Sequence, residues 1–89
     1  MKDEVITNID GTIDVVISEI ATATYINASY KMLIILKLKS GEAIVFESIW
    51  YYSHDMAKMK APFEEKVNEV KTKLRDYIRR NNAENQASN

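Results

Sequence analysis

The chain has 89 residues, which is the size of one small domain with a modest core. Its formal net charge of −1 excludes the strongly basic composition that is the simplest sign of a nucleic-acid-binding domain. Because the sequence contains no Cys, it can build neither a disulfide framework nor a thiolate metal site. No stretch resembles a signal peptide or approaches the roughly 20 apolar residues of a membrane span, so we expect a cytoplasmic protein with no membrane contact.

The N-terminal third of the chain predicts two strands. Residues 5–9 form a short β-prone run, and Asp10-Gly11 is a favoured hairpin turn. The second strand begins at Thr12 and continues towards Ile26. Its apolar residues do not alternate strictly with polar ones, which indicates either burial on both sides or a bulge near Ser18-Glu19.

Residues 30–50 carry the strongest β signal, two apolar runs separated by Ser40-Gly41. A two-residue loop at this turn predicts the cross-strand pairs Met32–Ile49, Ile35–Phe46 and Leu36–Val45. In that register one face carries Met32, Ile34, Leu36, Leu38, Ala43, Val45 and Ile49, interrupted by Glu47. The other carries Leu33, Ile35, Ile44, Phe46 and Trp50 among Lys31, Lys37 and Lys39. A hairpin with one solvated face should alternate cleanly, so we expect both faces to be covered.

The C-terminal part predicts one amphipathic helix over residues 62–80. Pro62 suits its first turn, where a missing N–H costs nothing. The apolar stripe of this helix contains Phe63, Val67, Val70, Leu74, Tyr77 and Ile78. Residues 81–89 are polar and have no core face, so they are predicted to be a disordered tail after a single domain of residues 1–80.

The order of these elements predicts the α+β class. We expect a four-stranded antiparallel β-meander followed by one C-terminal amphipathic helix packed on one face of the sheet. The second apolar face would then be covered by curvature of the sheet or by another copy of the chain.

The sequence shows no constellation of catalytic residues. The only histidine, His54, stands next to Asp55 in a predicted turn, and adjacent residues rarely form a site alone. Both glycines are explained by turns, so no phosphate-binding loop is apparent. We therefore predict a protein that is not an enzyme and that uses no cofactor or metal.

Three consecutive aromatic residues end the last predicted strand, and they are the best candidates for an interaction site. Tyr and Trp are enriched at interfaces, and Met adapts its shape to irregular partners. The candidate interaction residues are Trp50, Tyr51, Tyr52, Met56, Met59, Leu33, Ile35, Phe46 and Lys37.

Small size, no catalytic pattern and surplus sheet hydrophobicity favour a small regulatory or inhibitory module that acts through protein contacts, with an unidentified partner, as a homo-oligomer. A phage or mobile-element accessory protein would have this profile. One alternative is a single-stranded nucleic acid-binding protein that uses a face of lysines and aromatic residues. Another is an oligomer that binds a small ligand among its Tyr and Trp residues.

Overall fold

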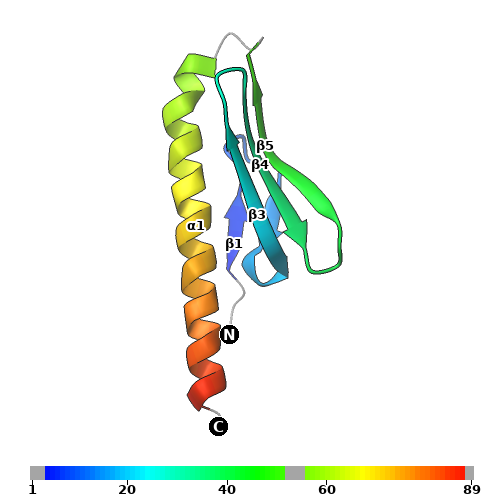
Figure 1. The fold of residues 1–89 in the computed structure, drawn as a ribbon, viewed down its shortest axis with the longest axis vertical. Helices are drawn as coiled ribbons and strands as arrows, with labels where there is room; N and C mark the ends of the chain where they lie inside the picture. Colours follow the sequence, from blue (N-terminus) through cyan, green and yellow to red (C-terminus); the bar gives the residue numbers. More distant parts are fainter. Residues whose placement is uncertain (1–3, 52–55, 88–89) are drawn as a thin grey trace.

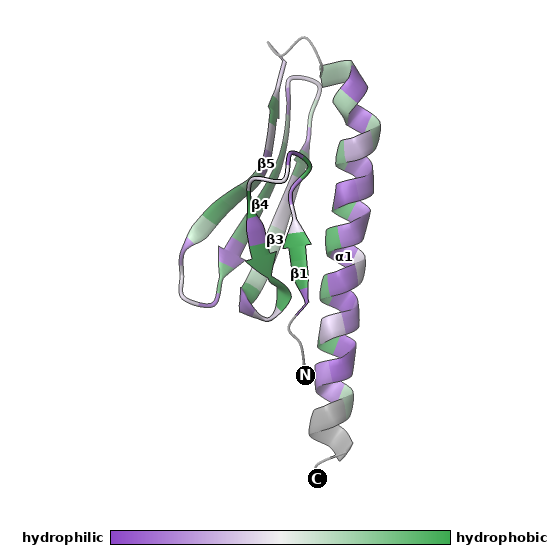
Figure 2. Ribbon diagram, turned by 180° about the vertical axis from the view of Figure 1, so that it is seen from behind, coloured by the Kyte–Doolittle hydropathy of each residue, from purple (hydrophilic) through white to green (hydrophobic). Residues whose placement is uncertain are grey.

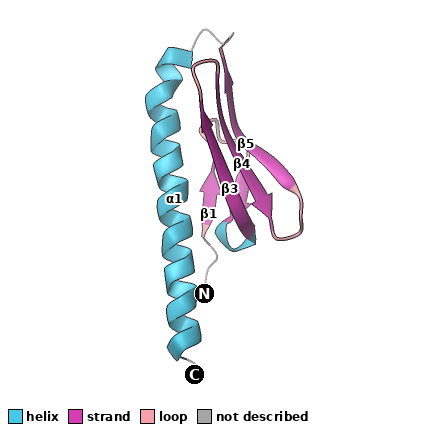
Figure 3. Cartoon of the chain, in the orientation of Figure 1, coloured by secondary structure: helices cyan, strands magenta, loops and turns pink. Residues whose placement is uncertain are grey.

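The computed structural model describes residues 4–51 and 56–87. Five strands and one long helix follow in order: β1 (Val5–Thr7), β2 (Asp14–Val16), β3 (Ile20–Asn27), β4 (Lys31–Leu38), β5 (Ala43–Trp50) and α1 (Met56–Ala87). A short 3-10 helix, Ile17–Glu19, separates β2 from β3. Figure 1 shows α1 running alongside the strands, and Figure 3 colours the same view by secondary structure. The predicted α+β class with an antiparallel sheet and a C-terminal helix is confirmed.

The described residues form five strands rather than the four predicted, and these strands make two antiparallel sheets. The β1–β2 hairpin is one sheet, and the meander β3-β4-β5 is the other. The predicted second strand is divided because Ile17–Glu19 coils into a 3-10 turn, close to the expected irregularity at Ser18-Glu19. This turn buries the Ile17 side chain, which is only 1% exposed, and lets the chain pass from one sheet to the other.

The β4–β5 hairpin departs from the predicted register at two points, each time by one residue. The Leu38 N–H bonds to the Glu42 carbonyl and the Gly41 N–H bonds to the Leu38 carbonyl, so the loop has three residues, with Gly41 at φ +96°. Leu36 therefore faces Ile44, and Ile35 faces Val45. Phe46 is then the extra residue of a β-bulge, because beyond it Met32 faces Ile49 as predicted.

These two shifts correct the predicted faces of β5. Phe46 lies on the covered face of the sheet and is 1% exposed, whereas Val45 lies on the opposite face and is 52% exposed. Ile44 also packs against the core. The prediction that put Ile44 and Phe46 among the lysines and Val45 in the core was wrong, because the extra loop residue exchanges the two faces of β5 up to the bulge, where Phe46 and Glu47 fall on the same side.

One hydrophobic core joins all the elements. The β1–β2 hairpin contributes Ile6 and Val15, the central strand β4 contributes its inward side chains, and α1 contributes Phe63 and Val70. Both the hairpin and the helix thus cover the same face of the β3-β4-β5 sheet. Figure 2 shows the apolar residues of α1 along the side that faces the strands.

The helix is longer than predicted at both ends. It begins at Met56 rather than Pro62, because Met56 and Met59 continue the apolar stripe and pack against the core. It also continues to Ala87, across residues that were predicted to be a disordered tail. Within the stripe, five predicted members pack on the core, but Ile78 is 55% exposed. The whole domain measures 53 × 24 × 21 Å.

Candidate functional site

The face of the β3-β4-β5 sheet that neither α1 nor the β1–β2 hairpin covers is the first candidate surface. We call it the open face. Strand alternation and the bulge direct to it the apolar side chains of Ile26, Leu33, Ile35, Val45 and Trp50, with Lys31 and Lys37 beside them. Leu33 is only 9% exposed among these neighbours, whereas Val45 is half exposed. A continuous apolar strip therefore crosses all three strands of this face.

Of the predicted interaction residues, Leu33, Ile35, Lys37 and Trp50 do lie together on the open face. The Trp50 indole donates a hydrogen bond of 2.7 Å to the Ser48 hydroxyl, and the Lys31 Nζ lies 5.8 Å from the centroid of the Trp50 ring. Tyr51 follows at the end of the strand with 68% of its surface exposed. These contacts fix the indole at one end of the apolar strip.

The remaining predicted interaction residues lie elsewhere. Phe46 is buried in the core, and Met56 and Met59 pack against the same core from α1. The predicted contact surface of aromatic residues and methionines is therefore divided between the two sides of the sheet. Tyr52, and with it His54 and Asp55, lies outside the described residues.

A second candidate surface, which the sequence analysis missed, lies between β3 and α1. Three neighbouring pockets, of about 500, 320 and 810 Å³, follow one another along this line. They share lining residues, with Asn27 common to the first two and Tyr25 and Lys71 common to the last two. We call this continuous depression the β3–α1 groove.

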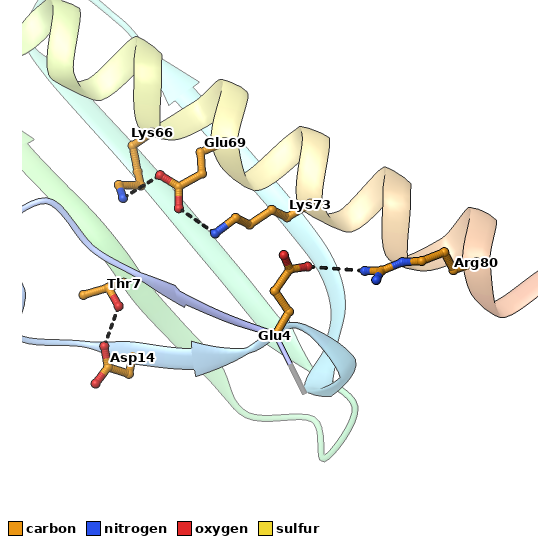
Figure 4. Close-up of polar contacts among 7 residues, drawn as sticks. All are labelled: Glu4, Thr7, Asp14, Lys66, Glu69, Lys73 and Arg80. Atoms are coloured by element: carbon orange, nitrogen blue, oxygen red, sulfur yellow. Dashed lines mark hydrogen bonds and ion pairs between the residues drawn. The ribbon is translucent and has the colours of Figure 1, made fainter. Parts of the chain in front are cut away.

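The ion pairing of the basic residues of α1 differs between the two sides of its apolar stripe. On the side near β1, Lys66 and Lys73 both pair with Glu69, at 2.9 and 3.4 Å, and Arg80 pairs with Glu4 (Figure 4). On the groove side, Lys60, Lys71 and Arg75 enter no ion pair with any described residue. Lys39, from the β4–β5 loop, joins them at the groove. The described lining also includes one carboxylate, that of Glu64, but no ion pair joins it to these cations, so the groove is positively charged overall.

The most deeply buried ionisable group among the described residues is Glu47, which shares the covered side of β5 with Phe46 and is 6% exposed. Its carboxylate accepts a hydrogen bond from the Ile9 backbone N–H. Burial raises the pKa of Glu47, Asp10 adds to the rise, and the Ile9 hydrogen bond and Lys66 oppose it. Through this hydrogen bond the carboxylate ties the β1–β2 hairpin loop to β5.

The described residues contain no group of three or more metal-ligating side chains. Nor does any helix in the described part of the chain have a stretch apolar enough to cross a bilayer. Comparison of the chain with protein-family models, with curated proteins and with solved structures finds no match in any of the three. The two surfaces themselves are therefore the basis for a functional proposal.

Proposed function

We propose that this protein is a small non-catalytic binding module that acts through protein contacts and that associates with a second copy through the open face. The single observation that carries this proposal is the apolar strip left uncovered on the β3-β4-β5 sheet. Val45 stands half exposed on the edge strand β5, and Ile35 is opposite it on the central strand β4. Exposed apolar patches of this kind mark interaction sites on small proteins.

The dimensions of the open face indicate a reversible contact. Strands of eight residues are about 26 Å long, and three strands span about 15 Å, a projected area of about 400 Å². Stable interfaces bury about 800 Å² on each partner. A dimer formed through this face alone should therefore dissociate in the micromolar range rather than persist at nanomolar concentration.

The bulge at Phe46 weakens the argument for single-stranded nucleic acid at this face. A stacking platform needs aromatic side chains on which bases can lie. With Phe46 in the core, Trp50 is the aromatic residue that the described strands place on the open face. Aliphatic Leu33 and Ile35 occupy the positions between the lysines, which suits a protein surface better than a nucleic acid.

Sedimentation velocity over a concentration series tests the proposal. We expect wild-type protein to shift from monomer towards dimer between about 1 and 100 μM, since a contact of this size has a micromolar dissociation constant. Val45→Lys should abolish this shift, because it puts a charge at the most exposed apolar position of the strip. Val5→Lys is the matched control, since Val5 is also exposed, at 43%, but lies on β1.

A monomer at every concentration, or equal loss of association in both variants, would refute the dimer. The nucleic-acid alternative is tested in parallel with mixed-sequence single-stranded DNA and RNA at physiological salt, where we expect no binding. A complex that weakens steeply with salt and is lost in Trp50→Ala would replace our proposal with that alternative.

A further inference from the structure

The β3–α1 groove has a free strand edge along one wall. β3 is an edge strand whose one partner among the described strands is β4. The Ala28 N–H bonds to the Lys31 carbonyl, so alternation directs the backbone groups of Ile26 and Thr24 towards β4. The N–H and C=O groups of Ala23, Tyr25 and Asn27 therefore point away from β4, to the free edge.

The opposite wall of the groove is the flank of α1. Leu74 and the half-exposed Ile78 supply an apolar surface, and Lys71 and Arg75 supply charge. The Lys71 Nζ lies 5.1 Å from the centroid of the Tyr25 ring, and the Lys39 Nζ lies 5.7 Å from that of Tyr77. These contacts hold two of the cations beside the edge strand rather than in bulk solvent.

We infer that the β3–α1 groove binds an extended, acidic segment of a partner protein, which adds to the edge of β3 as a further antiparallel or parallel strand. The free N–H and C=O groups of β3 would hydrogen-bond the backbone of the segment. Its carboxylates would face Lys39, Lys71 and Arg75, and its aliphatic side chains would cover Leu74 and Ile78. This inference is independent of the dimer proposed above, because it uses a different surface.

Charge selects this occupant over a second copy of the chain. β3 itself has no charged residue from Ile20 to Asn27, so it offers nothing to complement the cations of the groove. Pairing two β3 edges about a two-fold axis would also bring Lys71 and Arg75 of both copies towards each other. A nucleic acid would complement the charge but has no backbone amides to pair with the strand edge.

The direct test uses a seven-residue synthetic peptide of alternating valine and glutamate, capped at both ends, with the valine–lysine peptide as control. We expect the acidic peptide to bind and the basic peptide not to bind, as measured by NMR titration. Lys71→Glu should weaken binding at least tenfold. Lys58→Glu makes the same charge change on α1 outside the groove and should have no effect.

Two measurements distinguish strand addition from simple charge attraction. On peptide binding, the amides of Ala23 and Tyr25 should become protected from hydrogen exchange, whereas those of Thr22 and Thr24 already bond to β4. Ala23→Pro removes one outward N–H and obstructs the edge, so it should also weaken binding tenfold or more. Where Ala23→Pro does not fold, the exchange protection in the wild-type protein decides.

Several results would overturn the inference. These are no binding of the acidic peptide at millimolar concentration, equal weakening by Lys58→Glu and Lys71→Glu, or binding without protection of Ala23 and Tyr25. Equal affinity for mixed-sequence single-stranded DNA would also overturn it, as it would show a site for polyanions. Repeating the titration in Val45→Lys separates this result from self-association, since that variant leaves the groove unchanged.

Discussion

The buried carboxylate of Glu47 on β5 accepts a hydrogen bond from the backbone N–H of Ile9, in the loop of the β1–β2 hairpin. The two residues are 38 positions apart in the sequence, and their contact joins the small hairpin to the main sheet. Glu47 reaches this position because the bulge at Phe46 leaves both side chains on the covered face. A polar group thus helps to orient two sheets that share an apolar core.

This contact predicts a distinct dependence of stability on pH. Because burial raises the pKa of Glu47 above its unfolded value, the native state binds more protons than the unfolded state between the two pKa values. The Glu47 contribution to the free energy of unfolding therefore falls as pH rises through this window. Glu47→Gln should remove that contribution, so its stability relative to wild type should improve as pH rises through this window.

Denaturant titrations of both proteins at several pH values measure this difference. Glu69 acts in the opposite sense: burial raises its pKa, but hydrogen bonds and charge from Lys66 and Lys73 lower it overall. Its contribution is lost as pH falls through its folded pKa, but it is common to both proteins and cancels. A difference that stays constant with pH would show that Glu47 titrates normally.

A second prediction concerns the register of β3. Proline at position 23 removes an N–H that points to the free edge, whereas proline at position 24 removes one that bonds to β4. Ala23→Pro should therefore cost little stability, and Thr24→Pro should cost about 3 kcal/mol or more. Thermal melts of the two variants compare them directly. The reverse order would mean that β3 presents the other set of amides to its edge.

A third prediction compares two members of the helix stripe. Phe63 is fully buried, so Phe63→Ala should lower the free energy of unfolding by about 3–5 kcal/mol. Ile78 belongs to the same sequence pattern but is 55% exposed, so Ile78→Ala should change it by no more than about 0.5 kcal/mol. Urea unfolding of the two variants measures both values. Equal losses would place Ile78 in the core after all.

A fourth prediction concerns the β4–β5 loop. Gly41 has φ +96°, and a Cβ added there would meet no atom within 4 Å, so any cost of substitution is conformational. Gly41→Ala should destabilise the domain by about 1 kcal/mol. Gly41→Asn should cost less, because Asn tolerates positive φ better than Ala. An unchanged melting temperature for Gly41→Ala would contradict the three-residue loop.

The sequence predicted the α+β class and the core side of the helix because both depend on simple periodicity. Phe63, Val67 and Val70 recur at helical spacing, and only a helix collects them on one side. The strands on either side of Ser40-Gly41 were equally clear. What the pattern could not show was the length of the loop, because Ser40-Gly41 fits a two-residue turn and a three-residue turn equally well.

The wrong assignment of β5 residues to the two faces of the sheet follows from the one extra residue in this loop. A shift of register by one exchanges the two faces of a strand, and the bulge at Phe46 restores the register only in the second half of β5. Ile44, Val45 and Phe46 were therefore assigned to the wrong sides, while Leu33 and Trp50 were assigned correctly. The β3–α1 groove was missed for a different reason, since it joins residues from β3, the β4–β5 loop and α1 that no local pattern connects.

The length of α1 has a practical consequence for work with this protein. At 1.5 Å per residue its 32 residues extend about 48 Å, nearly twice the length of an eight-residue strand. Its C-terminal end thus projects past the strands, as Figure 1 shows, and lies far from the turn between β3 and β4. A fluorophore or surface linker attached there would stand clear of the open face and of most of the groove. Immobilisation through this end should leave both surfaces accessible to a partner.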